Sequence, residues 1–342
     1  MNSAIKNTLK FLLFLAVGVL LVYLIVRKIT LEDWKNIKLA AGSANYFWVG
    51  LCLLVGVLSH LLRAIRWRML IEPIDKKPGL LNTFCAVIIG YMANYAVPRL
   101  GEVSRCGVLS RYEKLSFAGL VGTVVVERAV DLLVMFLFFL VMLMLSFGQV
   151  YSIVKTKATL VLQGKWDSIK HINPVILIIG AIVVVGGLLF LYKKKDSLFG
   201  FARKFINNFI GGIKSIANLK KPFLFWVYSI GIWLLYLLML YVCCFSFPET
   251  SHLTLADALV VLMFGTFGVI APVPGGIGAY QWLVISALTH FYFISPNIAF
   301  TLAWILWGSQ LILIVVLGLI SLLLLPIINK DEQTGIRTVE NI

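Results

Sequence analysis

Charged residues are scarce in this chain. Only 13% of its 342 residues are Asp, Glu, Lys or Arg, whereas 61% are hydrophobic, a composition that excludes an ordinary soluble enzyme. Acidic residues are the scarcer kind, with 15 against 30 Lys and Arg. Cytoplasmic loops of membrane proteins are enriched in Lys and Arg, so this excess fits a membrane protein. No long basic domain is present, and nucleic acid is therefore not expected as a partner.

Cysteine and histidine are also few. The five cysteines, at positions 52, 85, 106, 243 and 244, form no CxxC pair, so neither a disulfide framework nor a zinc site is predicted. The four histidines are scattered without metal-ligand spacing. P-loop, GxSxG and DxD motifs are missing as well. The sequence therefore predicts no catalytic residue, no metal site and no cofactor.

Long apolar runs dominate what is present. Several exceed the roughly 18–20 residues that cross a bilayer, which predicts an all-α polytopic membrane protein. The first apolar run, which ends at residue 26, shows no small-residue cleavage pattern. It is therefore interpreted as a retained helix rather than a signal peptide. Segment 28–44 is polar and is expected at the membrane interface, and 198–221 is expected as an amphipathic cytoplasmic helix. About six full spans are predicted, at 7–26, 45–65, 115–147, 172–192, 222–247 and 296–326.

Three arginines, Arg63, Arg66 and Arg68, close the second predicted span, with Trp67 among them. Two interpretations stand. They can anchor the helix at the cytoplasmic interface, with snorkelling side chains beside an interfacial aromatic. Alternatively, they bind lipid phosphate. Segment 66–78, which is basic and contains two prolines, is expected as a loop.

Two further apolar runs are broken before they can cross. Residues 80–97 end at Pro98, and residues 255–271 end at the sequence APVPGGIG. Both are predicted to form re-entrant helical hairpins, at 80–112 and 255–293. With both termini cytoplasmic, this topology places more Lys and Arg inside than one in which every apolar run spans. Residue 75 and the loop 193–221 then lie inside, and residues 160 and 250 outside.

The hairpin topology makes two blocks, 45–147 and 222–326, into the same unit in opposite orientations. Pro98 follows Asn45 by 53 residues, and Pro274 follows Pro222 by 52. Inverted repeats with broken helices at matching positions indicate a transport site near the membrane midplane. Residues 1–326 are thus expected to form a single transmembrane domain, with 327–342 as a cytoplasmic tail.

The first break carries the main candidate site. Charges and helix breakers at membrane depth persist only when buried in protein or facing a polar cavity. A phosphate site and a structural salt-bridge cluster both fit this region. Glu127 and Asp131 are expected to pair with Arg99 and Arg105, either structurally or in a substrate or proton role. The candidate substrate-binding residues here are Asn94, Arg99, Glu102, Arg105, Glu127, Arg128 and Asp131, with Pro98 and Gly101 as structural positions.

The second break carries no charge. Its prolines and glycines allow a hinge or a close helix contact, and they leave backbone N–H groups free at the start of the next short helix, where a headgroup can bind. Gln281 follows directly as a candidate hydrogen-bond donor. The structural positions here are Pro272, Pro274, Gly275, Gly276 and Gly278.

The motifs NYAVPRLGEVSR, ERAVD and PVPGGIGAY resemble the membrane region of lysylphosphatidylglycerol synthases and their stand-alone, flippase-like relatives, over about residues 10–326. The resemblance implies a protein that moves an aminoacylated or glycosylated lipid between leaflets. Matching positions are Pro98, Arg99, Gly101, Glu102, Arg105, Arg128, Asp131, Gly275, Gly276 and Gly278. Relatives usually carry Glu where this chain has Gln281, so its substrate is expected to differ from a lysyl-lipid. The family's soluble synthase domain is not in this sequence, and its activity is not expected.

These observations predict a multi-pass protein of the cell inner membrane that binds, and translocates, a phospholipid or lipid-linked substrate with an anionic headgroup. A membrane-embedded transferase and a scaffold for a separate lipid synthase are the alternatives. A homo-oligomer is a further partner to consider.

Overall fold

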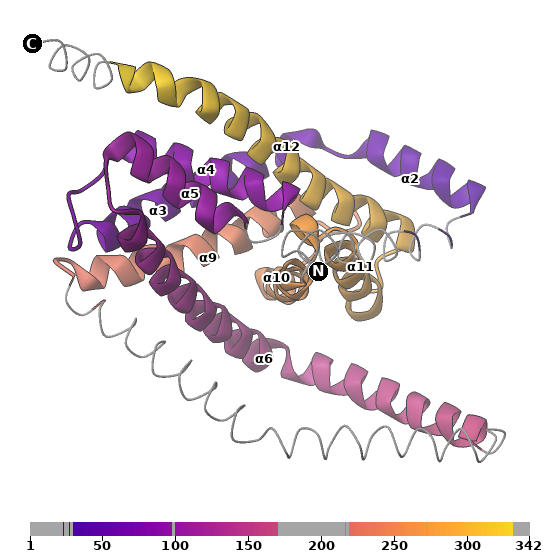
Figure 1. Cartoon of the computed structure of the whole chain (residues 1–342). Helices are drawn as coiled ribbons and strands as arrows, with labels where there is room; N and C mark the ends of the chain where they lie inside the picture. Colours follow the sequence, from indigo (N-terminus) through magenta and orange to yellow (C-terminus); the bar gives the residue numbers. More distant parts are fainter. Residues whose placement is uncertain are drawn as a thin grey trace, which may run out of the picture.

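The computed structural model describes Tyr23, Arg27, Ile216 and residues 30–97, 100–169, 219–271 and 273–330. This part of the chain is all helical (Figure 1). Four of its helices are long and apolar enough to cross a membrane: α3 (Tyr46–Ile71), α6 (Phe117–Ile169, apolar over Phe117–Ser146), α9 (Pro222–Cys244) and α12 (Pro296–Ile328). Because a helix rises about 1.5 Å per residue, even the shortest spans a hydrocarbon core of roughly 30 Å. The protein is therefore a polytopic membrane protein.

The first hairpin consists of α4 (Leu80–Ala96) and α5 (Leu100–Glu113). The two helices pack closely because glycines face each other, and a Cβ atom on Gly90 would lie only 2.8 Å from the Gly101 carbonyl oxygen. The side chain of Asn94 accepts a hydrogen bond from the Gly101 N–H at 2.7 Å, which caps the start of α5. The close approach of the two glycines and the Asn94 cap thus stabilise the tight hairpin that the sequence predicted at this position.

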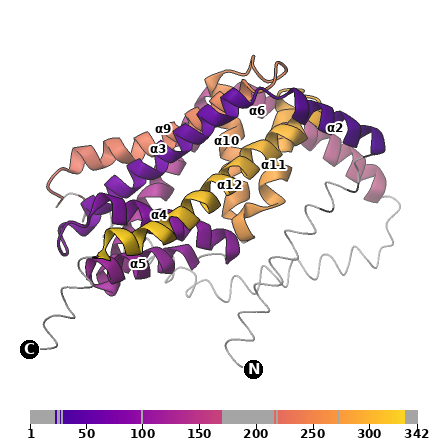
Figure 2. The same cartoon turned by 90° about the horizontal axis from the view of Figure 1, so that it is seen from above.

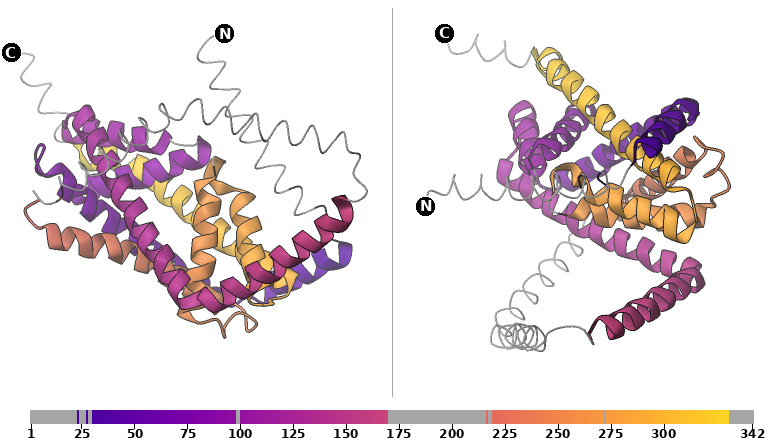
Figure 3. Two further views of the ribbon diagram at one scale, coloured as in Figure 1. Left: turned by 90° about the horizontal axis from the view of Figure 1, so that it is seen from below. Right: turned by 90° about the vertical axis from the view of Figure 1, so that its right-hand side faces the viewer.

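The second hairpin consists of α10 (Leu255–Ile270), the short 3-10 turn η1 (Pro274–Gly276) and α11 (Ala279–Phe291). Its turn requires glycine, because Gly275, Gly276 and Gly278 have φ values of 57°, 70° and 79°. A Cβ on Gly268 would lie 2.6 Å from the Cα of Tyr280, so α10 and α11 approach closely below the turn. The hairpin lies between α6 and α12 (Figure 3).

The two hairpins enter the helix bundle from opposite ends. The base of the first is tied to the end of α12, where the amides of Asn82 and Asn329 exchange hydrogen bonds of 2.9 and 3.0 Å. The base of the second lies near the start of α12. There Tyr292, directly after α11, donates a hydrogen bond back to the Asp257 carbonyl at 3.4 Å. Figure 2 shows α12 running past both hairpins.

The tips of the hairpins touch. Gly275 of the second hairpin lies against the ring of Tyr95 near the end of α4, since a Cβ on this glycine would lie 2.8 Å from Tyr95 Cε1. Trp307 on α12 donates a hydrogen bond from Nε1 to the Gly275 carbonyl at 2.7 Å. The two hairpin tips are therefore in direct contact, whereas an inverted repeat of the two blocks stays a prediction.

Two boundaries differ from the prediction. Helix α3 continues through Arg66 and Arg68 to Ile71, so the predicted loop 66–78 begins only after that residue. Helix α6 continues to Ile169, well beyond the predicted end of the span at 147, and its final part extends away from the other helices (Figure 1). The polar sequence after the span is thus helical as well. The interfacial segment contains α2 (Leu31–Ser43), capped by Thr30.

Several predicted elements lie outside the described residues. They are the helix at 7–26 apart from Tyr23, the helix at 172–192, the amphipathic helix 198–221 apart from Ile216 and residues 219–221, and the tail beyond Lys330.

Candidate functional site

Charged side chains from three helices meet inside the helix bundle, where α3, α5 and α6 come together. All are almost fully buried, and Glu127 and Arg66 expose no surface at all. An isolated charge in hydrocarbon costs on the order of 2.5–3.5 kcal/mol by insertion scales, so such residues persist when they pair with one another. The cluster consists of Arg63, Arg66, Arg105, Glu127 and Asp131.

The two carboxylates occupy one face of α6, four residues apart. Arg63 Nη1 donates to Glu127 Oε1 at 3.0 Å and to Asp131 Oδ2 at 2.6 Å. Arg105 Nη1 donates to Glu127 Oε1 at 3.1 Å. Arg66 Nη2 lies 2.7 Å from Asp131 Oδ1, close enough for an ion pair but not aligned as a hydrogen bond. Each carboxylate is thereby paired with two arginines, both from α3 for Asp131 and one each from α3 and α5 for Glu127.

Aromatic rings surround the arginines. The Arg105 guanidinium lies over the Trp67 ring, 4.6 Å from its centroid, and Arg63 lies 5.9 Å from the centroid of Tyr91. Arg63 also donates from Nη2 to the Tyr236 hydroxyl of α9 at 3.1 Å. Cation–π contacts strengthen where water is excluded, so these rings help to hold the cations in place.

One edge of the cluster is open. The side chain of Arg128 is 42% exposed, and it lies 3.6 Å from Glu102, whose side chain is 31% exposed. Its distances to Glu127 and Asp131 are 3.9 and 3.8 Å, too long for hydrogen bonds. Beside it, Nε and Nη2 of Arg105 are buried without a hydrogen-bond partner among the described residues. Four arginines face three carboxylates here, which leaves one positive charge in excess.

An ion pair lies outside the spans, just beyond the end of α3. Lys220 Nζ donates to the Glu72 carboxylate at 2.9 Å. This hydrogen bond lowers the pKa of Glu72 below its ordinary value. The pair connects the end of α3 to the segment that enters α9.

Comparison with known proteins identifies the family. The profile described as the lysylphosphatidylglycerol synthase TM region matches residues 11–318. The chain belongs to this family. No curated protein and no solved structure matches it. Membership in the lysylphosphatidylglycerol synthase transmembrane family, together with the four apolar helices, makes the chain a multi-pass membrane protein with a lipid-related function.

The structure brings together five of the charged residues that the sequence singled out: Glu102, Arg105, Glu127, Arg128 and Asp131. The predicted pairing of Arg105 with Glu127 is confirmed, and Arg128 lies 3.8 Å from Asp131. Arg99 and Pro98 lie outside the described residues, as does Pro272. That these residues of the lysylphosphatidylglycerol synthase transmembrane region bind substrate stays a prediction.

Two candidate substrate contacts have structural roles. Asn94 uses its side-chain oxygen to cap α5, as described above. Gln281 is fully buried and accepts a hydrogen bond from the Gly278 N–H at 2.7 Å, which caps α11 in the same way. Its Nε2 has no partner among the described residues. No contact connects Gln281 to the arginine cluster within the described part of the chain.

Sequence analysis missed the role of two arginines. The sequence left Arg63 and Arg66 open to two interpretations, an interfacial anchor or a lipid-phosphate ligand. Both are buried and are the main partners of Asp131, and phosphate binding by them stays a prediction. The snorkelling interpretation is therefore wrong for both. A signal was available, because arginines three residues apart share one face of a helix, and the two carboxylates of α6 needed cations on a neighbouring span.

Proposed function

We propose that this protein binds a lipid through its anionic headgroup at the open edge of the arginine cluster and moves that lipid between the leaflets of the cell inner membrane. The observation that carries the proposal is the excess positive charge inside the helix bundle. It coincides with buried Arg105 N–H groups that have no partner in the described chain and with a half-exposed Arg128 beside them. A headgroup phosphate supplies the acceptors that these donors need, and arginine is well suited to binding phosphate.

The residues divide into two roles. Arg63, Arg66, Glu127 and Asp131 form short ion pairs inside the bundle and hold the site together. Arg128, which is half-exposed, and Arg105, three residues from Glu102 on α5, are the arginines proposed to face the phosphate. Arg63 and Arg66 also have buried N–H groups without a hydrogen-bond partner among the described residues, but they lie deeper in the cluster beside Asp131. Glu102, at 3.6 Å from Arg128, is the counter-charge that the phosphate displaces. Arg99, which lies outside the described residues, is expected to join them.

Contact between the hairpin tips supports the transport step. The hairpins enter from opposite ends and meet at Tyr95 and Gly275, near the middle of the bundle. In transporters built this way, broken helices of the two halves line the substrate site. Separation of the tips on one side at a time would open the site alternately to each leaflet.

Charge asymmetry supports an orientation. At one end of the bundle residues 245–254 and 292–295 contain no Lys or Arg, and α2, whose Trp34 packs against Phe300 near the start of α12, adds Lys35 and Lys38 there. The opposite end, where α3 and α5 finish and α9 begins, is basic and is the proposed cytoplasmic side by the positive-inside rule. Its cations are Arg68, Lys76, Lys77, Arg111, Lys114, Lys220, Lys221 and Lys330.

Replacement of Arg128 tests the headgroup site. Arg128→Ala should fold, because its ion pairs are long and half-exposed, but it should retain co-purified anionic lipid about tenfold to a hundredfold less well, the value of one or two charge-assisted hydrogen bonds. Arg128→Lys should be intermediate, since lysine keeps the charge but not the fork of donors. Mass spectrometry of bound lipid and a dithionite assay of fluorescent phospholipid in proteoliposomes give the readouts.

Arg111→Ala is the matched control, because Arg111 is an exposed α5 arginine that lies over the Tyr112 ring and outside the cluster. Its lipid content and transport should equal those of the wild type. A folded Arg128→Ala variant with wild-type lipid content and wild-type transport would overturn the proposal. Loss of transport with lipid content intact would contradict the headgroup role of Arg128.

A further inference from the structure

Helices α4 and α12 pack against each other along a seam that is apolar over much of its length. Met92 of α4 lies against Gly318 of α12, where a Cβ atom would be 2.6 Å from Met92 Sδ. Nearer the base of the first hairpin, Cys85 shares a buried cluster with Leu325. Inside a bilayer such contacts gain no hydrophobic driving force, because lipid tails are as apolar as the side chains that they replace. Apolar packing alone would therefore hold this seam weakly.

A pair of amides closes the seam at the basic end of the bundle. Asn82 Nδ2 donates to Asn329 Oδ1 at 2.9 Å, and Asn329 Nδ2 donates back to Asn82 Oδ1 at 3.0 Å. Both residues are buried. Amide hydrogen bonds of this kind join helices inside membranes, and each is weak enough to break and form again. We call the pair of Asn82 and Asn329 the amide latch.

Each amide of the latch also has a second partner on its own side of the seam. Asn82 Nδ2 donates to the Glu113 carboxylate of α5 at 2.8 Å, and Asn329 Nδ2 donates to the Leu325 carbonyl of α12 at 2.8 Å. Both nitrogens therefore keep an acceptor when the latch opens. The two Oδ1 atoms lose a donor, which water at the end of the bundle can replace. Opening the latch thus leaves neither amide nitrogen without a hydrogen bond.

Stronger contacts hold the first hairpin on the side of α3 and α6. Arg105 of α5 pairs with Glu127 of α6 and lies over the Trp67 ring of α3. Arg68 of α3 also donates from Nε to the Pro78 carbonyl, just before α4, at 2.8 Å. Hydrogen bonds that involve a charged group are about twice as strong as neutral ones. The hairpin is therefore joined more firmly to α3 and α6 than to α12.

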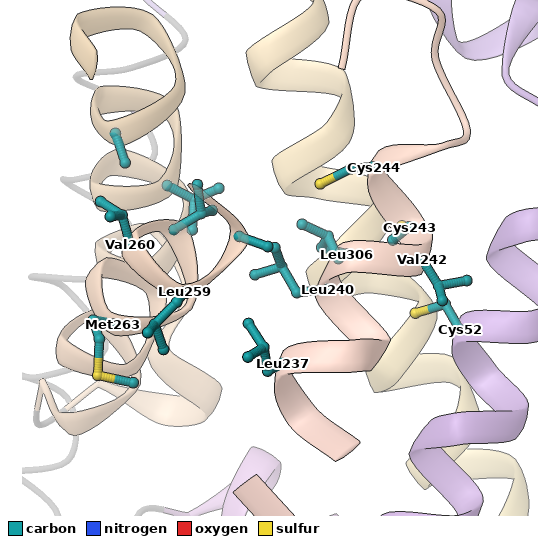
Figure 4. Packing of buried hydrophobic residues seen from close by; sticks show 14 of the residues in the cluster. Cys52, Leu237, Leu240, Val242, Cys243, Cys244, Leu259, Val260, Met263 and Leu306 are labelled. Atoms are coloured by element: carbon teal, nitrogen blue, oxygen red, sulfur yellow. The ribbon is translucent and has the colours of Figure 1, made fainter. Parts of the chain in front are cut away.

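The two ends of α12 are also held differently. Near its start, Leu306 belongs to the main core together with Leu240 of α9 and Leu259 of α10 (Figure 4). Toward its end, residues 322–324 are exposed, whereas Leu325 is buried in the cluster that it shares with α4. The seam with α4 is thus a main support for the end of α12.

We propose that the amide latch is a releasable gate. When it opens, the end of α12 and the first hairpin separate along the seam, while the hairpin stays joined to α3 and α6. Helix α4 also carries Tyr95, which lies against Gly275 where the hairpin tips touch, so opening of the seam displaces one side of that contact. The role of this gate in transport rests on the function proposed above, whereas the opening itself does not.

Cysteine reactivity tests the opening independently of transport. Two single-cysteine proteins are compared, one that keeps Cys85 in the seam and one that keeps Cys106, which is buried where the first hairpin packs on α3. In lipid nanodiscs, Asn82→Ala should raise the rate at which N-ethylmaleimide labels Cys85 by about tenfold, the effect of losing one or two hydrogen bonds. Labelling of Cys106 should not change.

Asn329→Ala removes the same pair from the other side of the seam and should have the same effect. An unchanged rate of Cys85 labelling in both variants would overturn the proposal. Faster labelling of Cys85 and Cys106 alike would show a general loosening of the hairpin and would overturn it too. Because the two variants alter different helices, one of them decides if the other does not fold.

A cross-link tests the role of the gate in transport. In a cysteine-free background, Asn82→Cys with Asn329→Cys allows a short bis-methanethiosulfonate reagent to join α4 to α12 across the seam. Asn82→Cys with Glu113→Cys is the matched control, because its cross-link joins α4 to α5 within the hairpin. The first cross-link should stop the transport of fluorescent phospholipid in proteoliposomes, with recovery on reduction, and the second should not.

The two experiments separate this proposal from the one on which its role rests. Transport that continues through a complete cross-link between positions 82 and 329 would contradict the gate. If the wild-type protein itself moves no lipid, the proposed transport fails, and the labelling of Cys85 still decides whether the latch opens.

Discussion

At the scale of single residues, Glu127 holds the buried cluster together. Its carboxylate accepts hydrogen bonds from arginines of two other helices, Arg63 on α3 and Arg105 on α5, and it exposes no surface. A buried charge of this kind is worth little as a net source of stability, but its removal leaves its partners uncompensated. Glu127 therefore acts mainly by keeping Arg63 and Arg105 from being buried without a counter-charge.

Replacement of Glu127 tests this account. Glu127→Gln keeps the shape of the side chain but leaves the arginines short of one negative charge, so it should lower the free energy of unfolding by roughly 3–5 kcal/mol. Thermal unfolding in detergent, followed by tryptophan fluorescence, provides the measurement. Glu102→Gln is the control, because its side chain is 31% exposed and its pair with Arg128 spans 3.6 Å, so its effect should stay below about 1 kcal/mol. Equal losses of unfolding free energy in Glu127→Gln and Glu102→Gln would show that the loss does not depend on burial of the carboxylate.

At the scale of elements, the two hairpins are stopped by the same device. In each, a side-chain amide oxygen accepts a hydrogen bond from a backbone N–H at the start of the second helix. Gly101 N–H donates to Asn94 in the first hairpin, and Gly278 N–H donates to Gln281 in the second. Each also depends on glycine where two backbones or a ring approach closely. Short apolar helices that would otherwise continue into a span therefore turn back.

The contact between the tips can be altered at Gly275. Gly275→Ala should be unfavourable for two reasons, since φ of 57° costs a residue with a side chain about 1–2 kcal/mol and the new Cβ would meet the Tyr95 ring. We expect a lower melting temperature and slower lipid transport in proteoliposomes. Gly308→Ala on α12, where a Cβ would meet nothing within 4 Å, should match the wild type.

A double variant separates the two causes. Tyr95→Ala combined with Gly275→Ala should recover the part of the loss that comes from the collision, because contacting residues are coupled energetically. Strictly additive losses would mean that the ring and the turn do not press on each other, contrary to the contact seen here.

At the scale of the whole molecule, α12 and the helix pair α3–α9 frame the site. Helix α12 contacts both hairpins, α3 supplies two of the arginines, and α9 supplies Tyr236. More of the basic residues lie at the end of this frame where Asn82 and Asn329 join the first hairpin to α12 than at the opposite end, where α2 carries Lys35 and Lys38. The same helices therefore hold the arginine cluster and the two hairpins, and their ends set the proposed orientation in the membrane.

Cysteine labelling tests the orientation. In a cysteine-free background, Asp75→Cys at the basic end should be protected from an impermeant maleimide in intact cells, and Glu249→Cys at the opposite end should react. Both native residues are exposed, so access to the reagent depends on the side of the membrane. Labelling of position 75 without labelling of position 249 would reverse the proposed topology.

The sequence by itself determined the class of protein and the positions of the breaks. Apolar runs of the length of a bilayer and prolines and glycines inside shorter runs are local features, and the structure agrees with them at α3, α9, α12 and both hairpins. The charges marked as a site were also right in part, because Arg105 and Glu127 do meet.

Only the tertiary structure decided which side chains share a partner. Arg63 looked like an interfacial anchor because sequence shows the composition of a helix end but not what packs against it, and its carboxylates lie on another helix. For the same reason Asn94 was interpreted as a substrate contact, although the backbone of the next helix uses its oxygen. Helical periodicity assigns a residue to a face, whereas packing among α3, α5, α6 and α9 determines what that face meets.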